Sequence, residues 1–63
     1  MRIVLKRDVA GGIIPNTPLM VPDQPAGAMG VLVGPHPLDP REYIVEIDGN
    51  RYAVTREVFD YVH

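Results

Sequence analysis

The chain of 63 residues contains no cysteine, no serine and no tryptophan. Without cysteine it forms neither a disulfide nor a thiolate metal cluster, which are the two devices that stabilise many domains of this size. Without serine and cysteine it also lacks the usual side chains of nucleophilic catalysis. The sequence therefore predicts a domain that is not an enzyme and that binds no cofactor.

Long apolar runs are missing as well. The first segment, "MRIVLKRDVAGG", has only a short apolar core, Ile3 to Leu5, between Arg2 and Lys6. A secretory signal needs about 7 to 15 apolar residues in a row, and a membrane-spanning helix needs about 20. We therefore expect a soluble, cytoplasmic protein that does not enter a membrane.

Residues that could hold a metal or exchange protons are scattered. His36 lies between two prolines, and His63 is the last residue, so the ligand spacing of zinc sites is absent. Glu46 and Asp48 would share one face of a strand, where they are expected to be solvated. The glycines of "AGAMGVLVG" match neither the dinucleotide fingerprint nor the phosphate-binding loop. We therefore expect His36 to be a solvated loop histidine, the two carboxylates to lie on a solvated face of the hairpin, and the glycines to serve turns.

Proline is abundant: there are seven, and five of them lie between Val21 and Pro40. Each proline removes a backbone donor and interrupts any helix of ordinary length in the middle of the chain. Their P-x-x-P spacings could present polyproline surfaces, but we interpret them as stiffening of two loops. Between these loops lies "MGVLVG", which is predicted to be a strand that is either buried on both faces or lies across a small core.

The flanking segments are rich in residues that favour strands. "RIVLKRDV" predicts a first strand with Ile3 and Leu5 on one face. "IIPNTPLMV" predicts an edge strand or an irregular loop, in which Ile13 and Ile14 are able to pack. At the other end, "TREVFDYVH" predicts one helical turn from Thr55, followed by a closing strand that includes Phe59, Tyr61 and Val62.

The clearest local signal is "EYIVEIDGNRYAVT", which predicts a β-hairpin. Either residues 48–49 or residues 49–50 form its loop. The first choice places Glu46 opposite Arg51, and the second places Asp48 there. Both choices put the same four side chains on one face, namely Val45, Ile47, Tyr52 and Val54.

The order of these segments resembles the Src-homology-3-like small β-barrels, and within them the KOW-like modules of translation and transcription factors. Those modules carry a glycine before an apolar strand, as Gly30 stands before Val31 here, and a Y-x-V-x-x-D-G hairpin, matched here by Tyr43, Val45, Asp48 and Gly49. The sequence departs from them in its acidic balance, and "GPHPLDPRE" replaces a basic loop that often touches RNA.

The resemblance covers most of the chain and implies one domain over residues 1–63. We expect an all-β, five-stranded, partly open barrel with long proline-rich loops and one short helical turn near the C-terminus. The predicted core consists of apolar residues from every strand: Ile3, Leu5, Val31, Val33, Val45, Ile47, Tyr52, Val54, Phe59 and Val62.

A chain this short hides only about 60% of the surface that it exposes when unfolded, so buried area gained at an interface would stabilise it. We therefore expect a non-catalytic interaction module that binds a protein partner or forms a homo-oligomer. The candidate contact residues lie in the loop before the middle strand and at its start: Leu19, Met20, Val21, Pro22, Pro25 and Met29.

Two other functions remain open. A nucleic-acid-binding or regulatory module of the KOW-like type would use the internal basic residues Lys6, Arg7, Arg41, Arg51 and Arg56. The net charge of -2 and the pI near 5.4 disfavour it. An accessory subunit or inhibitor of a larger enzyme would present a surface in the same way as the first candidate, and the sequence does not separate those two.

Overall fold

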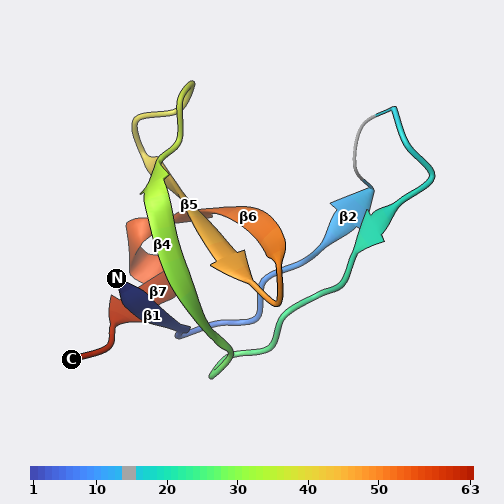
Figure 1. Cartoon of the computed structure of the whole chain (residues 1–63). Coiled ribbons are helices and arrows are strands. Elements are labelled where there is room, and N and C mark those ends of the chain that lie inside the picture. The colour runs from blue at the N-terminus through green and yellow to red at the C-terminus, as the bar shows by residue number, and fades with distance from the viewer. Residues whose placement is uncertain (14–15) are drawn as a thin grey trace.

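The computed structural model describes residues 1–13 and 16–63, and these form short strands and one 3₁₀ turn. The all-β prediction is confirmed (Figure 1). None of the helical structure in these ranges is long and apolar enough to span a membrane. In chain order the elements are β1 (Arg2–Leu5), β2 (Gly12–Ile13), β3 (Met20–Val21), β4 (Met29–Pro35), β5 (Glu42–Ile47), β6 (Asn50–Thr55), η1 (Arg56–Val58) and β7 (Phe59–Tyr61).

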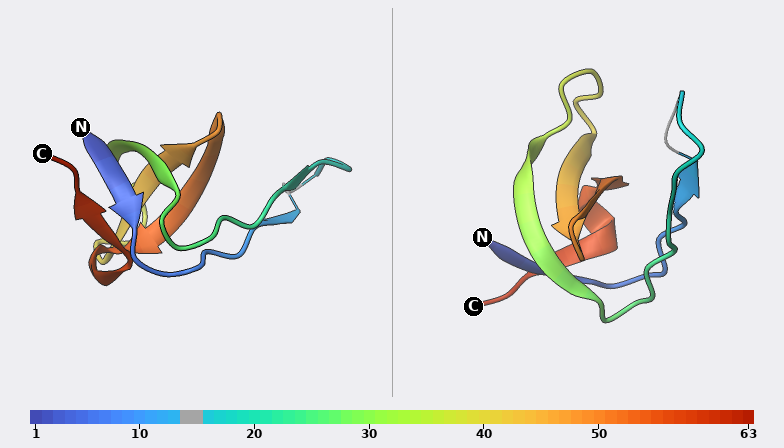
Figure 2. Two further views of the ribbon diagram at one scale, coloured as in Figure 1. Left: turned by 90° about the horizontal axis from the view of Figure 1, so that it is seen from below. Right: turned by 45° about the vertical axis from the view of Figure 1, so that its right-hand side comes forward.

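The strands form two antiparallel sheets. Five of them make one sheet in the order β6-β5-β4-β1-β7, and β2 pairs with β3 as a separate ribbon. The long strand β4 is therefore central, and the outermost strands β6 and β7 do not pair with each other in the described part of the chain. The larger sheet is curved, whereas the ribbon projects away from it (Figure 2).

The predicted hairpin is confirmed as β5 and β6. Ile47 pairs with Asn50, so Asp48 and Gly49 form the loop, and their φ angles are 53° and 79°. Two consecutive left-handed residues define the type I′ turn, whose twist matches that of paired strands. Glu46 therefore lies opposite Arg51, and the Arg51 Nε is 3.6 Å from the Glu46 Oε1. This selects the first of the two predicted registers.

A small apolar core lies on the concave side of the five-stranded sheet. The Phe59 ring is fully buried and packs edge-on against Tyr43 and Tyr61, with ring centroids 5.8 and 5.7 Å apart. Strands β1, β5, β6 and β7 all contribute to this core. Its buried apolar residues all belong to the predicted core, and they are Ile3, Leu5, Val45, Ile47, Tyr52, Val54 and Phe59.

Of the two alternatives predicted for β4, burial on both faces is wrong, and so is the assignment of Val31 and Val33 to the core. Val31 and Val33 are 40% and 45% exposed, and the inward positions are held by Gly30, opposite Ile3, and by Leu32, opposite Val45. The pairing of β4 with β1 fixes this choice, because residues directly opposite each other share a face. Gly30 is opposite the buried Ile3, so its neighbour Val31 faces outward.

The end of the chain folds as predicted up to Tyr61. Thr55 precedes η1, and the Arg56 guanidinium lies over the rings of Phe59 and Tyr61, at 4.8 and 4.6 Å from their centroids. The same side chain donates a hydrogen bond to the Phe59 carbonyl. The prediction that Val62 belongs to the closing strand and to the core is wrong, because Val62 follows the last strand and is only half-buried.

Candidate interaction surface

The main candidate surface is a two-stranded arm, defined here as residues 6–13 and 16–28, which leaves the sheet after β1 and returns to it at β4 (Figures 1 and 2). Near its outer end Ile13 pairs with Met20 in the β2–β3 ribbon. Closer to the sheet, Val9 and Gln24 exchange two backbone hydrogen bonds of 2.8 Å. The two limbs of the arm therefore run side by side over most of its length.

Two aspartates join the limbs where the regular strand pairing is interrupted. The Asp23 Oδ1 accepts a 2.7 Å hydrogen bond from the Gly11 N–H, and the Asp8 Oδ1 accepts one of 2.8 Å from the Ala26 N–H. The carboxylates take the place of the missing backbone carbonyls and satisfy amide groups in both limbs. They stabilise an irregular ribbon that contains little regular strand.

Gly11 is required by a close approach of the two limbs. A Cβ atom at this position would lie 2.0 Å from the Val21 carbonyl oxygen and 2.7 Å from the backbone of Pro22. Both contacts are with backbone atoms, which cannot move aside as a flexible side chain can. Glycine at this position therefore allows the limbs to meet.

The base of the arm is attached to the core through Tyr52 on β6. The Tyr52 hydroxyl donates a 2.7 Å hydrogen bond to the Pro22 carbonyl, and it accepts one of 3.2 Å from the Gln24 side-chain amide. Gln24 is the buried polar residue of the described chain, at 6% exposure. Val9 and Val21 also pack against the core. The base is thus fixed in position.

The outer end of the arm is apolar and exposed. Ile13, Leu19 and Met20 are 69%, 60% and 70% exposed. Ile13 and Met20 are directly opposite each other and share one face, whereas Val21 points the other way, toward the core. No residue from 9 to 22 carries a charged side chain. The arm tip, defined as Ile13, Leu19 and Met20, is therefore an uncharged apolar surface.

The predicted contact residues do not all gather on this surface. Leu19 and Met20 lie at the tip, and Pro22 and Pro25 are exposed along the returning limb. Val21 is half-buried against the core, and Met29 lies on the five-stranded sheet instead of the arm.

Sequence reasoning left Ile13 out of the contact set, although its place in an uncharged stretch was a usable signal. The neighbouring Ile14, which was expected to be able to pack, lies outside the described residues.

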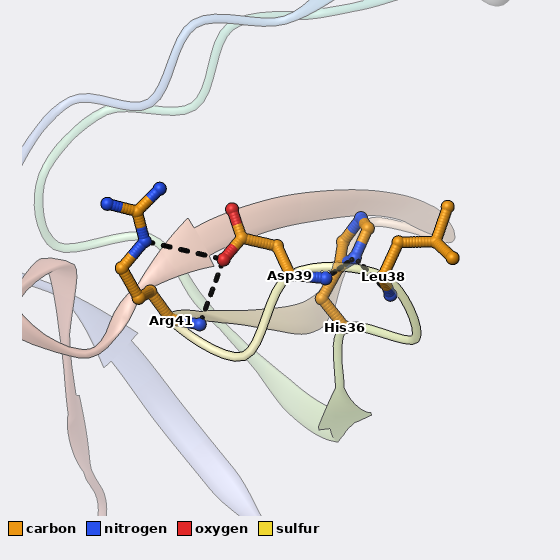
Figure 3. Close-up of polar contacts among 4 residues, drawn as sticks. All are labelled: His36, Leu38, Asp39 and Arg41. Carbon is orange, nitrogen blue, oxygen red and sulfur yellow. Dashed lines mark hydrogen bonds and ion pairs between the residues drawn. The ribbon is translucent and has the colours of Figure 1, made fainter.

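A second exposed apolar residue, Leu38, lies in the loop between β4 and β5 (Figure 3). The His36 Nδ1 accepts hydrogen bonds from the backbone N–H groups of Leu38 and Asp39, at 3.0 and 3.1 Å. The Asp39 Oδ1 in turn accepts a 2.9 Å bond from the Arg41 N–H. These bonds hold the loop in one shape with Leu38 88% exposed. His36 was expected to be solvated, but it is half-buried and organises the loop.

The basic residues proposed for nucleic-acid contact are spread over different elements, and most interact with other groups of the chain. Lys6 lies 3.8 Å from Asp60, Arg41 lies 3.5 Å from Asp39, and Arg51 pairs with Glu46. Arg56 covers aromatic rings, as described above.

Arg7 and Lys6 lie near Glu57. Hydrogen bonds from its own backbone N–H and from the Thr55 hydroxyl, helped by these two positive charges, lower the pKa of Glu57. The five basic residues thus form no common unpaired patch within the described chain.

Across residues 1–13 and 16–63, no three His, Asp or Glu side chains are grouped so that they could hold a metal ion.

In comparisons with known proteins, no protein family, no curated protein and no solved structure matches the chain.

Proposed function

We propose that this protein is a non-catalytic interaction module whose main contact element is the arm tip. The observation that carries the proposal is that Ile13, Leu19 and Met20 are each at least 60% exposed on an uncharged, projecting ribbon. Two-stranded ribbons are only marginally stable in water, and each square ångström of apolar surface removed from water contributes about 25 cal/mol. Covering this tip with a partner both stabilises the ribbon and provides binding energy.

We also propose that the five-stranded sheet is a partly open small barrel of the Src-homology-3-like type. Three features support this assignment: the long excursion between β1 and β4, the tight β5–β6 hairpin, and the single turn η1 before the closing strand. The core residues of β1, β5, β6 and β7 are enclosed by one curved sheet. Such an architecture accommodates many functions, so the arm tip, and not the fold, carries the proposed function.

The partner that best fits the arm tip is a protein with an apolar depression. The tip has no charge with which to recognise a phosphate or a basic site, and its side chains are aliphatic or thioether groups that pack into apolar pockets. The nucleic-acid alternative is less well supported, because Lys6, Arg41 and Arg51 already pair with acidic groups.

The test is co-purification of the full chain from its native cell, with quantitative comparison of the proteins retained by variants. Met20→Asp places a charge at the arm tip, and Leu38→Asp is the matched control, because Leu38 is an apolar residue at least as exposed as Met20 but lies in the β4–β5 loop. We expect one partner to be retained by the wild type and by Leu38→Asp, and to fall about tenfold with Met20→Asp.

Two results would contradict the proposal. One is the same set of retained proteins for the wild type and for Met20→Asp, with both chains folded by circular dichroism. The other is retention of nucleic acid that declines steeply with added salt and is reduced by Arg41→Gln, which would favour the alternative function.

A further inference from the structure

The outer face of the five-stranded sheet carries a second apolar surface, separate from the arm tip. Met29, Val31 and Val33 all point outward from β4 and are 53%, 40% and 45% exposed. We call these three residues the outer stripe. Because β4 is the central strand, the stripe runs along the middle of the sheet. Contiguous exposed apolar patches, unlike single exposed apolar residues, are typical of contact surfaces.

Neighbouring strands widen the stripe on both sides. Val4 of β1 lies directly opposite Met29, so the two side chains share the outer face. On the other side, Ile44 of β5 alternates with the buried Val45 and lies beside the irregularity at Val33. Val4 and Ile44 are half-buried. The stripe is therefore the exposed ridge of a broader apolar face.

A row of charges crosses the stripe at its midpoint. Val31 lies between Arg2 on β1 and Glu46 on β5, and the next residue in the row is Arg51 on β6. Arg2 makes no ion pair with any described residue, whereas the Glu46 Oε1 is 3.6 Å from Arg51. A positive charge thus lies on one side of Val31 and a negative charge on the other.

We infer that a second copy of this chain packs on the outer stripe, related to the first by a two-fold axis parallel to β4. A half-turn about that axis places β1 of one copy over β5 of the other. The charged rows of the two copies then lie at the same position along the strands. Arg2 of each copy then lies opposite Glu46 of the other, while Val31 meets Val31 at the centre. The contact is self-complementary, as a two-fold interface requires.

The same charges disfavour the other symmetric arrangement. A half-turn about an axis across the strands would place Arg2 over Arg2 and Glu46 over Glu46, and like charges brought together at an interface are strongly unfavourable. The charge row therefore selects one arrangement out of two. It also favours a second copy over an unrelated protein, because one surface supplies both halves of the complementary pattern.

The required contact area fits the size of the chain. A specific interface buries at least about 1,000 Å² in total, or about 500 Å² from each copy. The isolated chain exposes 4435 Å², so the outer stripe and its flanking side chains need to contribute only a minor part of the surface. Two sheets packed face to face keep their strands within about 30° of each other, which agrees with an axis along β4.

The test is charge reversal followed by sedimentation equilibrium of the full chain over a range of concentrations. We expect the wild type to dimerise, and Arg2→Glu and Glu46→Arg each to raise the dissociation constant about tenfold. The double variant, Arg2→Glu with Glu46→Arg, restores the pair with reversed polarity and should recover most of the lost affinity. Val31→Lys should abolish the dimer.

Matched controls separate this interface from other effects. Arg41→Glu reverses a charge in the β4–β5 loop, and Arg51→Gln removes the partner of Glu46 within the chain; neither should weaken the dimer. Met20→Asp alters the arm tip and should also leave it intact. Circular dichroism of each variant confirms that the chain remains folded.

The inference is overturned if the wild type is monomeric at every concentration, if the dimer survives Val31→Lys, or if the double charge reversal is no tighter than the single ones. A dimer that dissociates with Met20→Asp but not with Val31→Lys would also overturn it. That last result would support self-association through the arm tip. A monomeric wild type would leave the arm tip free to bind another protein. The dimer and the arm-tip contact can therefore fail independently of each other.

Discussion

The Tyr52 hydroxyl donates a 2.7 Å hydrogen bond to the Pro22 carbonyl, although the two residues are 30 positions apart in the chain. Tyr52 belongs to the core hairpin, and Pro22 belongs to the returning limb of the arm. One side chain thus links the apolar nucleus to the projecting ribbon. Because Gln24 also donates to this hydroxyl, the link includes the buried polar residue of the arm.

Removing this hydroxyl should loosen the arm without disturbing the core. Tyr52→Phe keeps the ring but removes the hydrogen-bond partner of the Pro22 carbonyl and of the Gln24 side-chain amide. This loss should lower the free energy of unfolding by about 1 to 2 kcal/mol. Urea denaturation measures the loss, and hydrogen exchange should speed up at the Val9 and Gln24 amides. Tyr61→Phe is the control, because the Tyr61 hydroxyl makes no hydrogen bond to the described residues. Equal losses in the two variants would contradict the prediction.

Two glycines of β4 should respond very differently to alanine. A Cβ at Gly30 would lie 2.2 Å from the Glu46 carbonyl oxygen and 2.7 Å from the Ile47 side chain, so Gly30→Ala should cost about 1 to 3 kcal/mol. Gly34 has no atom within 4 Å of the same position, and Gly34→Ala should change stability by about 0.5 kcal/mol or less. In thermal melts, 1 kcal/mol corresponds to about 4 to 8 °C for a domain of this size. Similar melting temperatures for the two variants would refute the described packing of β4 on β5.

Phe59 should be the most sensitive aromatic position. Its ring is fully buried, meets Tyr43 and Tyr61 edge-on, and lies under Arg56. Phe59→Leu keeps an apolar side chain but loses these ring contacts, and it should cost about 2 kcal/mol in chemical denaturation. Leu38→Ala, at a residue 88% exposed, should stay within about 0.5 kcal/mol of the wild type. A larger loss at Leu38 would mean that the β4–β5 loop packs against the domain.

The lowered pKa of Glu57 makes its contribution to stability dependent on pH. Hydrogen bonds from its own backbone N–H and from Thr55, together with the charges of Arg7 and Lys6, favour the carboxylate in the folded chain. A carboxyl group whose pKa is lower in the folded chain than in the unfolded chain stabilises the fold at pH values above its pKa in the unfolded chain. This stabilisation is lost as the pH falls through its pKa in the folded chain. Glu57→Gln should therefore be less stable than the wild type near neutral pH.

Denaturation curves of the wild type and Glu57→Gln at about pH 7 and at about pH 3 measure this effect. The difference in the free energy of unfolding between the wild type and Glu57→Gln should be smaller at the acidic pH. Added salt should also reduce the part that comes from Arg7 and Lys6, because Glu57 is fully exposed to solvent. A difference that is the same at both pH values would show that the carboxylate charge has no role.

Of the candidate surfaces, the sequence indicated the apolar arm but not its geometry. Leu19 and Met20 could be predicted as exposed, because prolines surround them and exclude a buried strand. Val21 pairs with Gly12, and this pairing turns its side chain inward. Met29 pairs with Val4, and this pairing places it on a different surface. Neither pairing has a local signal.

The sequence by itself determined the all-β class, the β5–β6 hairpin and which of the hairpin's side chains face the core. On both sides of Asp-Gly, large apolar residues stand at every second position, whereas the positions between them include the charged Glu46 and Arg51. One face of the hairpin is therefore the more apolar, and that face is buried. Tertiary structure decided the orientation of β4, since "VLV" is apolar at every position and offers no contrast between its two faces. Pairing with β1 and β5 settled it, because only Gly30 allows β4 to approach the Glu46 carbonyl so closely.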